Sequence, residues 1–186
     1  MTETKAPTPD TTSYHNPNVP AADIGLNRDV FLRTLMRELS GTLQDLVGIE
    51  EASGFISVVG KNVGHYINDG FKNKLHLQHL DKDTVADVLV SLKERIEGDF
   101  YVIEEDDEKI VFGNRTCPFG DKVKGRPSLC MMTSNVFGTI TANNLGYAKV
   151  DLEETIADGH TGCRVTVYTT PSEASMAANG REYMPD

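Results

Sequence analysis

The 186-residue sequence lacks the features that mark membrane-spanning and secreted proteins. No apolar run reaches the ~18–20 residues that a helix needs to cross a bilayer, and the polar, proline-containing N-terminus has no apolar signal core. There are only three cysteines, and this odd count fits a disulfide framework poorly. We therefore expect a cytoplasmic protein whose thiols stay reduced.

Basic residues are also scarce, with 18 Lys and Arg against 28 Asp and Glu and a net charge of −10. Phosphate binding needs a basic face, so this balance argues against nucleic acid and anionic membranes as direct partners. The sequence has no Gly-Lys-Ser/Thr phosphate loop and no dinucleotide fingerprint after a strand. It offers no catalytic constellation, which favours a non-enzymatic role while leaving an enzyme possible.

The chain is long enough for one domain with a real core. Residues 1–25 are rich in Pro, Thr, Asn and Asp without an apolar period, which predicts a disordered arm. Residues 26–171 are expected to form a single domain, and residues 172–186 a flexible tail.

Hydrophobic periodicity predicts the elements of this domain. Asn27 can cap the first helix, and Gly60 and Gly64 in the second indicate close packing of a neighbouring element. The predicted helices cover about 28–47, 50–75, 82–97 and 130–146, and the predicted strands 100–104, 109–113, 147–152 and 163–170. This order defines an α+β fold with N-terminal helices packed on a small, mostly antiparallel sheet and one helical crossover.

The predicted topology brings Cys117, Cys130 and Cys163 to one end of the sheet. Cys117 follows a strand, Cys130 starts the crossover helix at that end, and Cys163 opens the last strand after the chain returns. The helix dipole should also favour the Cys130 thiolate. A metal or iron–sulfur site, a redox switch and buried apolar cysteines are the three interpretations. Candidates for a fourth ligand are Asp121, Glu153, Glu154, Asp158 and His160.

Residues of about 48–170 resemble the 4-vinyl reductase domain family, in particular its methanogen output domain branch. The segments GNRTC and SLCMMTSNVFGTITANNLGYAKVDLEETIADGHTGCRV carry the resemblance. It implies a fold shared with heme nitric-oxide sensors and Golgi-transport tethering subunits. In related phenol sensors one Glu and three Cys bind zinc. Cys130 and Cys163 match two of those cysteines, Cys117 stands at the Glu position, and Thr155 stands at the remaining position.

The resemblance implies a sensory or regulatory domain with a thiol site formed by Cys117, Cys130 and Cys163, completed by His160 or left open. The site would hold a [4Fe–4S] cluster or Zn²⁺ and report redox state or a small ligand. The resemblance also implies a homodimer formed through the N-terminal helices and a separate signalling protein as partner. The alternatives are an enzyme or accessory factor of tetrapyrrole metabolism and a purely structural interaction module.

The other histidines carry weaker hypotheses. His76 and His79, with Asp81, could ligate a metal, but a helix terminus or a solvated loop is the plainer interpretation. His65 could ligate heme by analogy with the nitric-oxide sensors.

Overall fold

The structure is a computed structural model that describes residues 15, 16 and 18–185. The described residues belong to two compact units, one ending at residue 32 and the other beginning at residue 33. Most of the expected N-terminal arm lies outside the described residues. The described part of the first unit contains a 3₁₀ turn, η2 (Val19–Ala21), and the start of helix α1 (Arg28–Val47). Asn27 caps this helix as predicted, because its Oδ1 accepts a hydrogen bond from the Val30 backbone N–H at 2.9 Å.

The longer helices match the predicted ones closely. They are α1, α2 (Ile49–Leu75), α3 (Lys82–Glu94) and α4 (Cys130–Leu145). Asp81 caps α3 by accepting from the Thr84 N–H, and Gly146 ends α4 with a φ of +87°. His76 ends α2 in the left-handed conformation. His76 and Asp81 are therefore helix termini, which agrees with the interpretation preferred above to a metal site. No helix in the described part of the chain is long and apolar enough to cross a membrane.

The second unit is built on one five-stranded sheet of order β1-β2-β4-β3-β5. Every neighbouring pair is antiparallel, and β3 runs in the direction of β2 with β4 between them, as the predicted crossover requires. The α+β prediction is therefore confirmed. The strands are β1 (Phe100–Glu105), β2 (Lys109–Asn114), β3 (Ala148–Glu154), β4 (Cys163–Tyr168) and β5 (Arg181–Tyr183).

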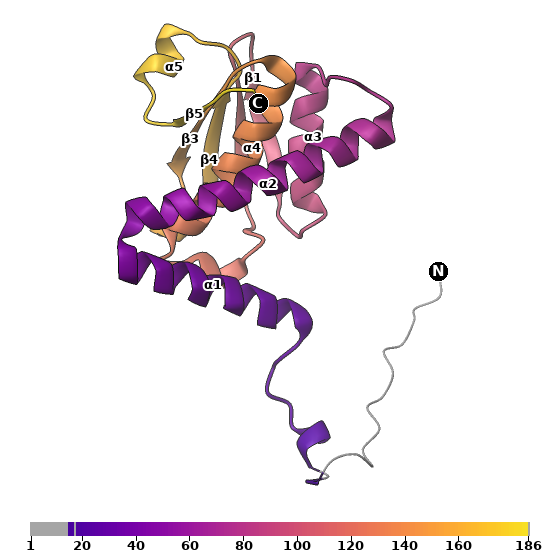
Figure 1. Cartoon of the computed structure of the whole chain (residues 1–186), viewed down its shortest axis with the longest axis vertical. Helices are drawn as coiled ribbons and strands as arrows, with labels where there is room; N and C mark the ends of the chain where they lie inside the picture. Colours follow the sequence, from indigo (N-terminus) through magenta and orange to yellow (C-terminus); the bar gives the residue numbers. More distant parts are fainter. Residues whose placement is uncertain (1–14, 17, 186) are drawn as a thin grey trace. The chain divides into compact units, whose positions relative to one another are not determined.

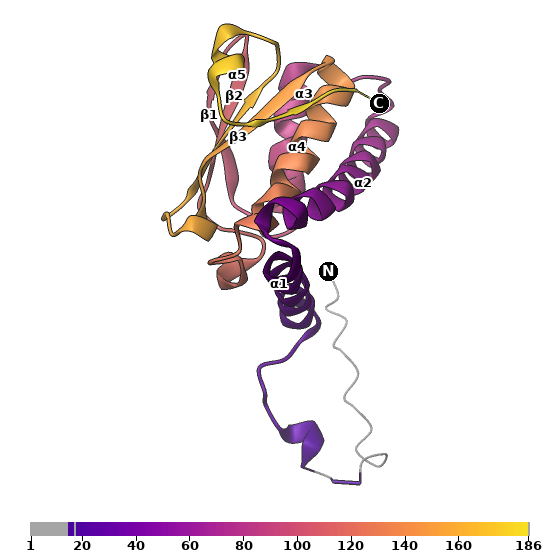
Figure 2. The same ribbon diagram turned by 60° about the vertical axis from the view of Figure 1, so that its left-hand side comes forward.

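The helices of this unit form two layers on one face of the sheet. Helices α3 and α4 lie against the sheet, and α2 crosses α4 on the side away from it (Figures 1 and 2). Phe137 of α4 stands at the centre of the core, in edge-to-face contact with Phe100 and Phe112 at 5.5 and 5.4 Å between ring centroids. This packing fixes the start of α4 at one end of the sheet.

Two glycines allow α2 to approach α4 closely. A Cβ on Gly60 would lie 2.7 Å from Cβ of Asn135, and a Cβ on Gly64 would lie 2.9 Å from Cβ of Thr139. Real Cβ atoms do not approach so closely, so these positions need glycine. The prediction that Gly60 and Gly64 are packing positions is confirmed.

The C-terminal segment differs from the flexible tail expected at 172–186. It forms a short helix, α5 (Glu173–Ala177), with a Ser172–Ser175 capping box, and then β5, which pairs with β3. Tyr183 of β5 packs its ring on Gly138 and shares a hydrogen bond of 2.7 Å between its hydroxyl and Ser134 Oγ. The segment looked loose in the sequence because its strand is short and polar. The strand is held by pairing with a distant part of the chain.

Candidate functional site

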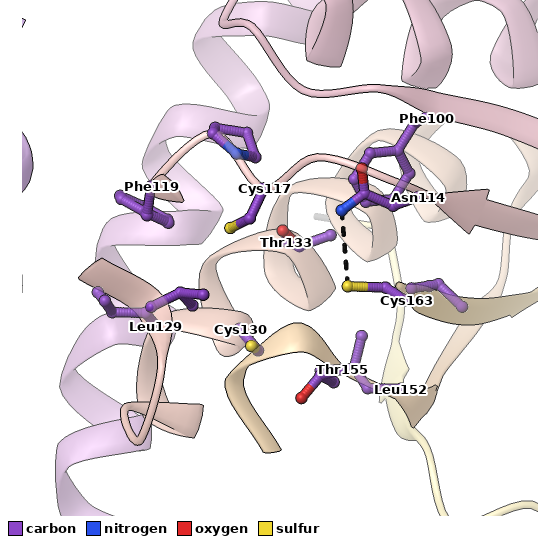
Figure 3. Close-up of a pocket in the computed structure, with 13 residues that line it drawn as sticks. Phe100, Asn114, Cys117, Phe119, Leu129, Cys130, Thr133, Leu152, Thr155 and Cys163 are labelled. Carbon is purple, nitrogen blue, oxygen red and sulfur yellow. Dashed lines mark hydrogen bonds between the residues drawn. The ribbon is translucent and has the colours of Figure 1, made fainter. Parts of the chain in front are cut away.

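Three thiols face one small, partly enclosed cavity at the end of the sheet where α4 begins. The cavity has a volume of about 30 Å³. Cys117 comes from the loop after β2, Cys130 is the first residue of α4, and Cys163 is the first residue of β4. Figure 3 shows their three sulfur atoms pointing into the same space. The predicted convergence of the cysteines is therefore confirmed.

Asn114, the last residue of β2, organises this end of the sheet. It pairs with Cys163 across the β2–β4 ladder, and its side-chain Nδ2 donates a hydrogen bond to Cys163 Sγ at 3.5 Å. Its Oδ1 accepts from the backbone N–H of Thr116 at 3.1 Å, which holds the start of the loop that carries Cys117. One buried amide thus connects the positions of two of the three thiols.

The surroundings of the thiols are apolar. Val123, Leu129 and Ala157 form a small buried cluster against which Cys117 and Cys130 pack. Burial raises the pKa of Cys117, and it raises the pKa of Cys130 to about 12, with the neighbouring thiols adding to the effect. The sequence analysis expected the helix dipole to favour the Cys130 thiolate, but desolvation of the sulfur acts in the opposite direction and favours the protonated thiol.

The fourth side of the cavity is closed by Thr155, which is buried. Its hydroxyl donates to Asp158 Oδ2 at 2.6 Å and accepts from the Asp158 backbone N–H at 3.2 Å. These bonds cap the 3₁₀ turn η5 (Ile156–Asp158), and the Thr155 side chain also interacts with the Cys130 thiol, whose pKa it lowers against the larger effect of burial. Thr155 therefore acts here as a wall of the cavity and as a cap.

The other candidates for a fourth ligand lie elsewhere. His160 is exposed in the turn after η5 and does not line the cavity, so its placement gives no support to a role as ligand. Glu153 bonds to Arg164 and Thr166, and Asp121 pairs with Lys124 at the surface. Asp158 bonds to Thr155, and its charge adds to the rise in the pKa of Cys130 that burial causes.

The thiols do not stand as a preformed site for a single ion. Among the described residues, no group of three or more His, Cys, Asp and Glu side chains is arranged to hold a metal ion. The donor set nevertheless suits one, because three thiols share a small, largely apolar cavity. A single ion would have to draw the three thiolates closer together.

Lys93 of α3 is a member of this site that the sequence analysis missed. Its side chain is buried, with 5% of the residue exposed, and its Nζ donates to Thr133 Oγ1 at 2.7 Å. The ammonium also lies over two rings, 4.9 Å from the centroid of Phe100 and 5.2 Å from that of Phe137. Burial lowers the pKa of Lys93 to about 8. The three cysteines have the opposite, smaller effect and raise this pKa.

A helical pattern could have found this lysine. Lys93 stands four residues after Leu89 and eight after Val85, both of which are fully buried. Residues at these spacings share one face of a helix, so Lys93 falls on the apolar face of α3. A lysine on such a face needs an explanation.

His65, considered as a heme ligand, packs instead within the α2–α4 interface. Its Nδ1 lies 3.2 Å from Nδ2 of Asn143, in a hydrogen bond between the two side chains. The Asn144 side chain makes a second such link by donating to Asn68 Oδ1 at 2.7 Å. This interface is therefore polar along much of its length, with Asn135 donating to Ser57 at 2.9 Å.

The architecture is also found in a solved structure, that of subunit 3 of the trafficking protein particle complex from Naegleria fowleri covalently bound to palmitic acid. The two structures align with a TM-score of 0.57 and 13% sequence identity, over 85% of this chain and 98% of that one. At this identity the likeness shows the fold alone. This fold is the one predicted from the resemblance to the 4-vinyl reductase-like domains.

The family follows from a second comparison. The model of the family described as methanogen output domain 1 matches residues 35–168, which include all three cysteines. The chain belongs to this family, a member of the 4-vinyl reductase-like branch, as the resemblance predicted. No curated protein matches the sequence.

Proposed function

We propose that this chain is a non-enzymatic regulatory domain that holds an inorganic group between Cys117, Cys130 and Cys163 and responds to the state of that group. The observation that carries the proposal is that all three cysteines of the chain, from three separate elements, point into one cavity. The description of the family as an output domain accords with a regulatory role.

The size of the cavity favours an inorganic group over an organic one. A cavity of about 30 Å³ exceeds the ~10–15 Å³ needed to hold one water molecule, but it is far smaller than a tetrapyrrole or an acyl chain. The palmitic acid of the trafficking-complex subunit therefore has no counterpart in this cavity. Zn²⁺ completed by water or another ligand suits three thiolates in a space of this size. A [4Fe–4S] cluster with one open iron suits the same donors but would require the cavity to widen.

The protonation of the thiols favours a bound group over a free redox switch. A reactive cysteine needs an accessible thiolate, but burial raises the pKa of Cys117 and Cys130. A metal centre would reverse this effect, because its positive charge deprotonates the thiols that bind it.

Elemental analysis and absorption spectroscopy of the anaerobically purified chain test the proposal. Iron and sulfide in near-equal amounts with a broad band near 400 nm would identify a cluster, and colourless protein with zinc would identify a zinc site. Serine at each of the three cysteines should reduce the bound metal, whereas His160→Ala should leave it unchanged. The proposal fails if the chain takes up neither iron nor zinc, or if the three serine variants retain as much metal as the wild type.

We also propose that a second copy of the chain covers the exposed apolar face of α1 and α2. On α2, Phe55, Val59, Val63 and Tyr66 recur at helical spacing and are exposed, beside the face that packs on α4. On α1, Leu35, Leu39 and Leu46 are also exposed and recur at helical spacing. Contiguous exposed apolar residues of this kind mark interaction sites, and the family resemblance implies a homodimer through these helices.

Light scattering coupled to gel filtration tests this assembly. The wild type should have the mass of a dimer, and Val59→Glu should have that of a monomer. Ile103→Glu, at an exposed apolar position of β1, is the matched control and should stay a dimer. A monomeric wild type would assign the face to a different partner and would reject the homodimer.

A further inference from the structure

Lys93 is a buried cation without an acidic partner. In the described part of the chain, no Asp or Glu forms an ion pair with it, and its one hydrogen bond goes to the neutral hydroxyl of Thr133. A buried charge is costly unless it is paired, and the two aromatic rings offset only part of this cost. Among the described residues, no carboxylate balances the charge of this lysine.

The position of Lys93 is explained by the thiol cavity. Thr133, which receives its hydrogen bond, lines this cavity together with Phe100, which lies under its ammonium. Burial lowers the pKa of Lys93, and the three cysteine sulfurs oppose this by raising it. The lysine therefore stands beside the place where negative charge would develop if the thiols bound a metal.

We propose that Lys93 is the counter-cation of the inorganic group held by the three thiolates, and that it selects a group whose complex carries net negative charge. A doubly positive centre bound by three thiolates has a net charge of minus one, and the ammonium of Lys93 balances it within a site of low polarity. This inference rests on the proposed function, because it requires that the thiols bind such a group.

The proposal predicts opposite effects of one substitution in the two states of the protein. Lys93→Met keeps the length of the side chain and removes the charge. The empty protein should be no less stable in urea than the wild type, because an unpaired buried cation is lost. The same variant should bind iron–sulfur cluster or zinc at least tenfold more weakly, because the complex then lacks its counter-charge.

A second buried lysine provides the matched control. Lys149 of β3 is also almost buried, with 8% exposed, and does not line the cavity. Lys149→Met should leave the affinity for metal unchanged. Lys93→Gln, which is neutral but can still bond to Thr133, should weaken binding as Lys93→Met does.

The experiment is reconstitution of the full chain with iron and sulfide, or with zinc, under anaerobic conditions, followed by titration with a chelator. For a cluster, the reduction potential of Lys93→Gln should also be lower than that of the wild type, because a positive charge near the cluster has been removed. If the wild type holds metal and both Lys93 variants hold it equally well, the counter-cation is rejected and the thiol site stands. If both variants fail to fold when empty, Lys93 is structural and the inference is also rejected. If the wild type binds neither iron nor zinc, both the counter-cation role of Lys93 and the proposed function are rejected.

Discussion

Asn114 donates a side-chain hydrogen bond to the sulfur of Cys163, its partner across the β2–β4 ladder, at 3.5 Å. The same amide accepts from the Thr116 backbone, so it joins the end of one strand, the start of another and the loop of Cys117. Asn114→Ala should lower the free energy of unfolding by about 0.5–1.5 kcal/mol, because it removes the side-chain hydrogen bond that holds the loop of Cys117. Urea denaturation of the metal-free protein measures this loss.

Asn73, which is exposed on α2, offers the control for this substitution. Asn73→Ala should change the stability by no more than about 0.5 kcal/mol. Equal effects of the two substitutions would show that Asn114 does not organise this end of the sheet.

The glycines of α2 should respond to alanine in two opposite ways. Gly60→Ala brings a Cβ to 2.7 Å from Asn135 and should destabilise the protein by about 1–3 kcal/mol. Gly54 and Gly70 have no neighbouring atom within 4 Å of such a Cβ, so alanine there should add up to about 1 kcal/mol through its higher helix propensity. The denaturant midpoints of the three variants, each compared with that of the wild type, measure these changes in stability. A stabilising Gly60→Ala would contradict the close packing of α2 on α4.

Tyr183 should make the stability depend on alkaline pH. Burial raises the pKa of Tyr183 to about 12, above the ordinary value of 10.0 for a tyrosine. Between these values the folded protein keeps the phenolic proton while the unfolded chain releases it, so stability falls as the pH rises. The loss amounts to about 2–3 kcal/mol across this window.

Tyr183→Phe removes the titrating group and provides the comparison. The wild type should lose stability relative to Tyr183→Phe as the pH rises from 9 to about 12. A constant difference over this range would mean that Tyr183 is hydrated and that β5 does not hold it against Gly138.

Cys130 should be a poor nucleophile in the metal-free protein. Because its pKa is raised to about 12, the thiolate is rare at neutral pH and the sulfur is largely shielded. Its alkylation by iodoacetamide at pH 7.5 should be on the order of a hundredfold or more slower in the native protein than in urea, as followed by peptide mass spectrometry. If Cys130 is alkylated at the same rate in the native protein and in urea, its thiol is reactive and the thiols are better interpreted as a redox switch.

The sequence predicted the elements and the convergence of the cysteines because both depend on local periodicity and chain direction. The apolar period of α1 to α3 is strong, whereas α4 is buried on nearly every side. Strand lengths then determine which end of the sheet each cysteine reaches. The pairing of Val150 with Arg181, which makes β5 part of the sheet, joins residues far apart in sequence and leaves no local pattern. The raised pKa of Cys130 and the role of Asn114 likewise depend on burial and on distant neighbours.

The spacing of the cysteines has a consequence for the unfolded chain. Twelve residues separate Cys117 from Cys130, and thirty-two separate Cys130 from Cys163. A group bound to all three sulfurs would close both segments into loops and act as a three-way crosslink, which lowers the entropy of the unfolded state more as the loops lengthen. The second loop contains all of α4 and β3 and so ties the central helix to the sheet. Loss of the group would remove the crosslinks of both loops at once.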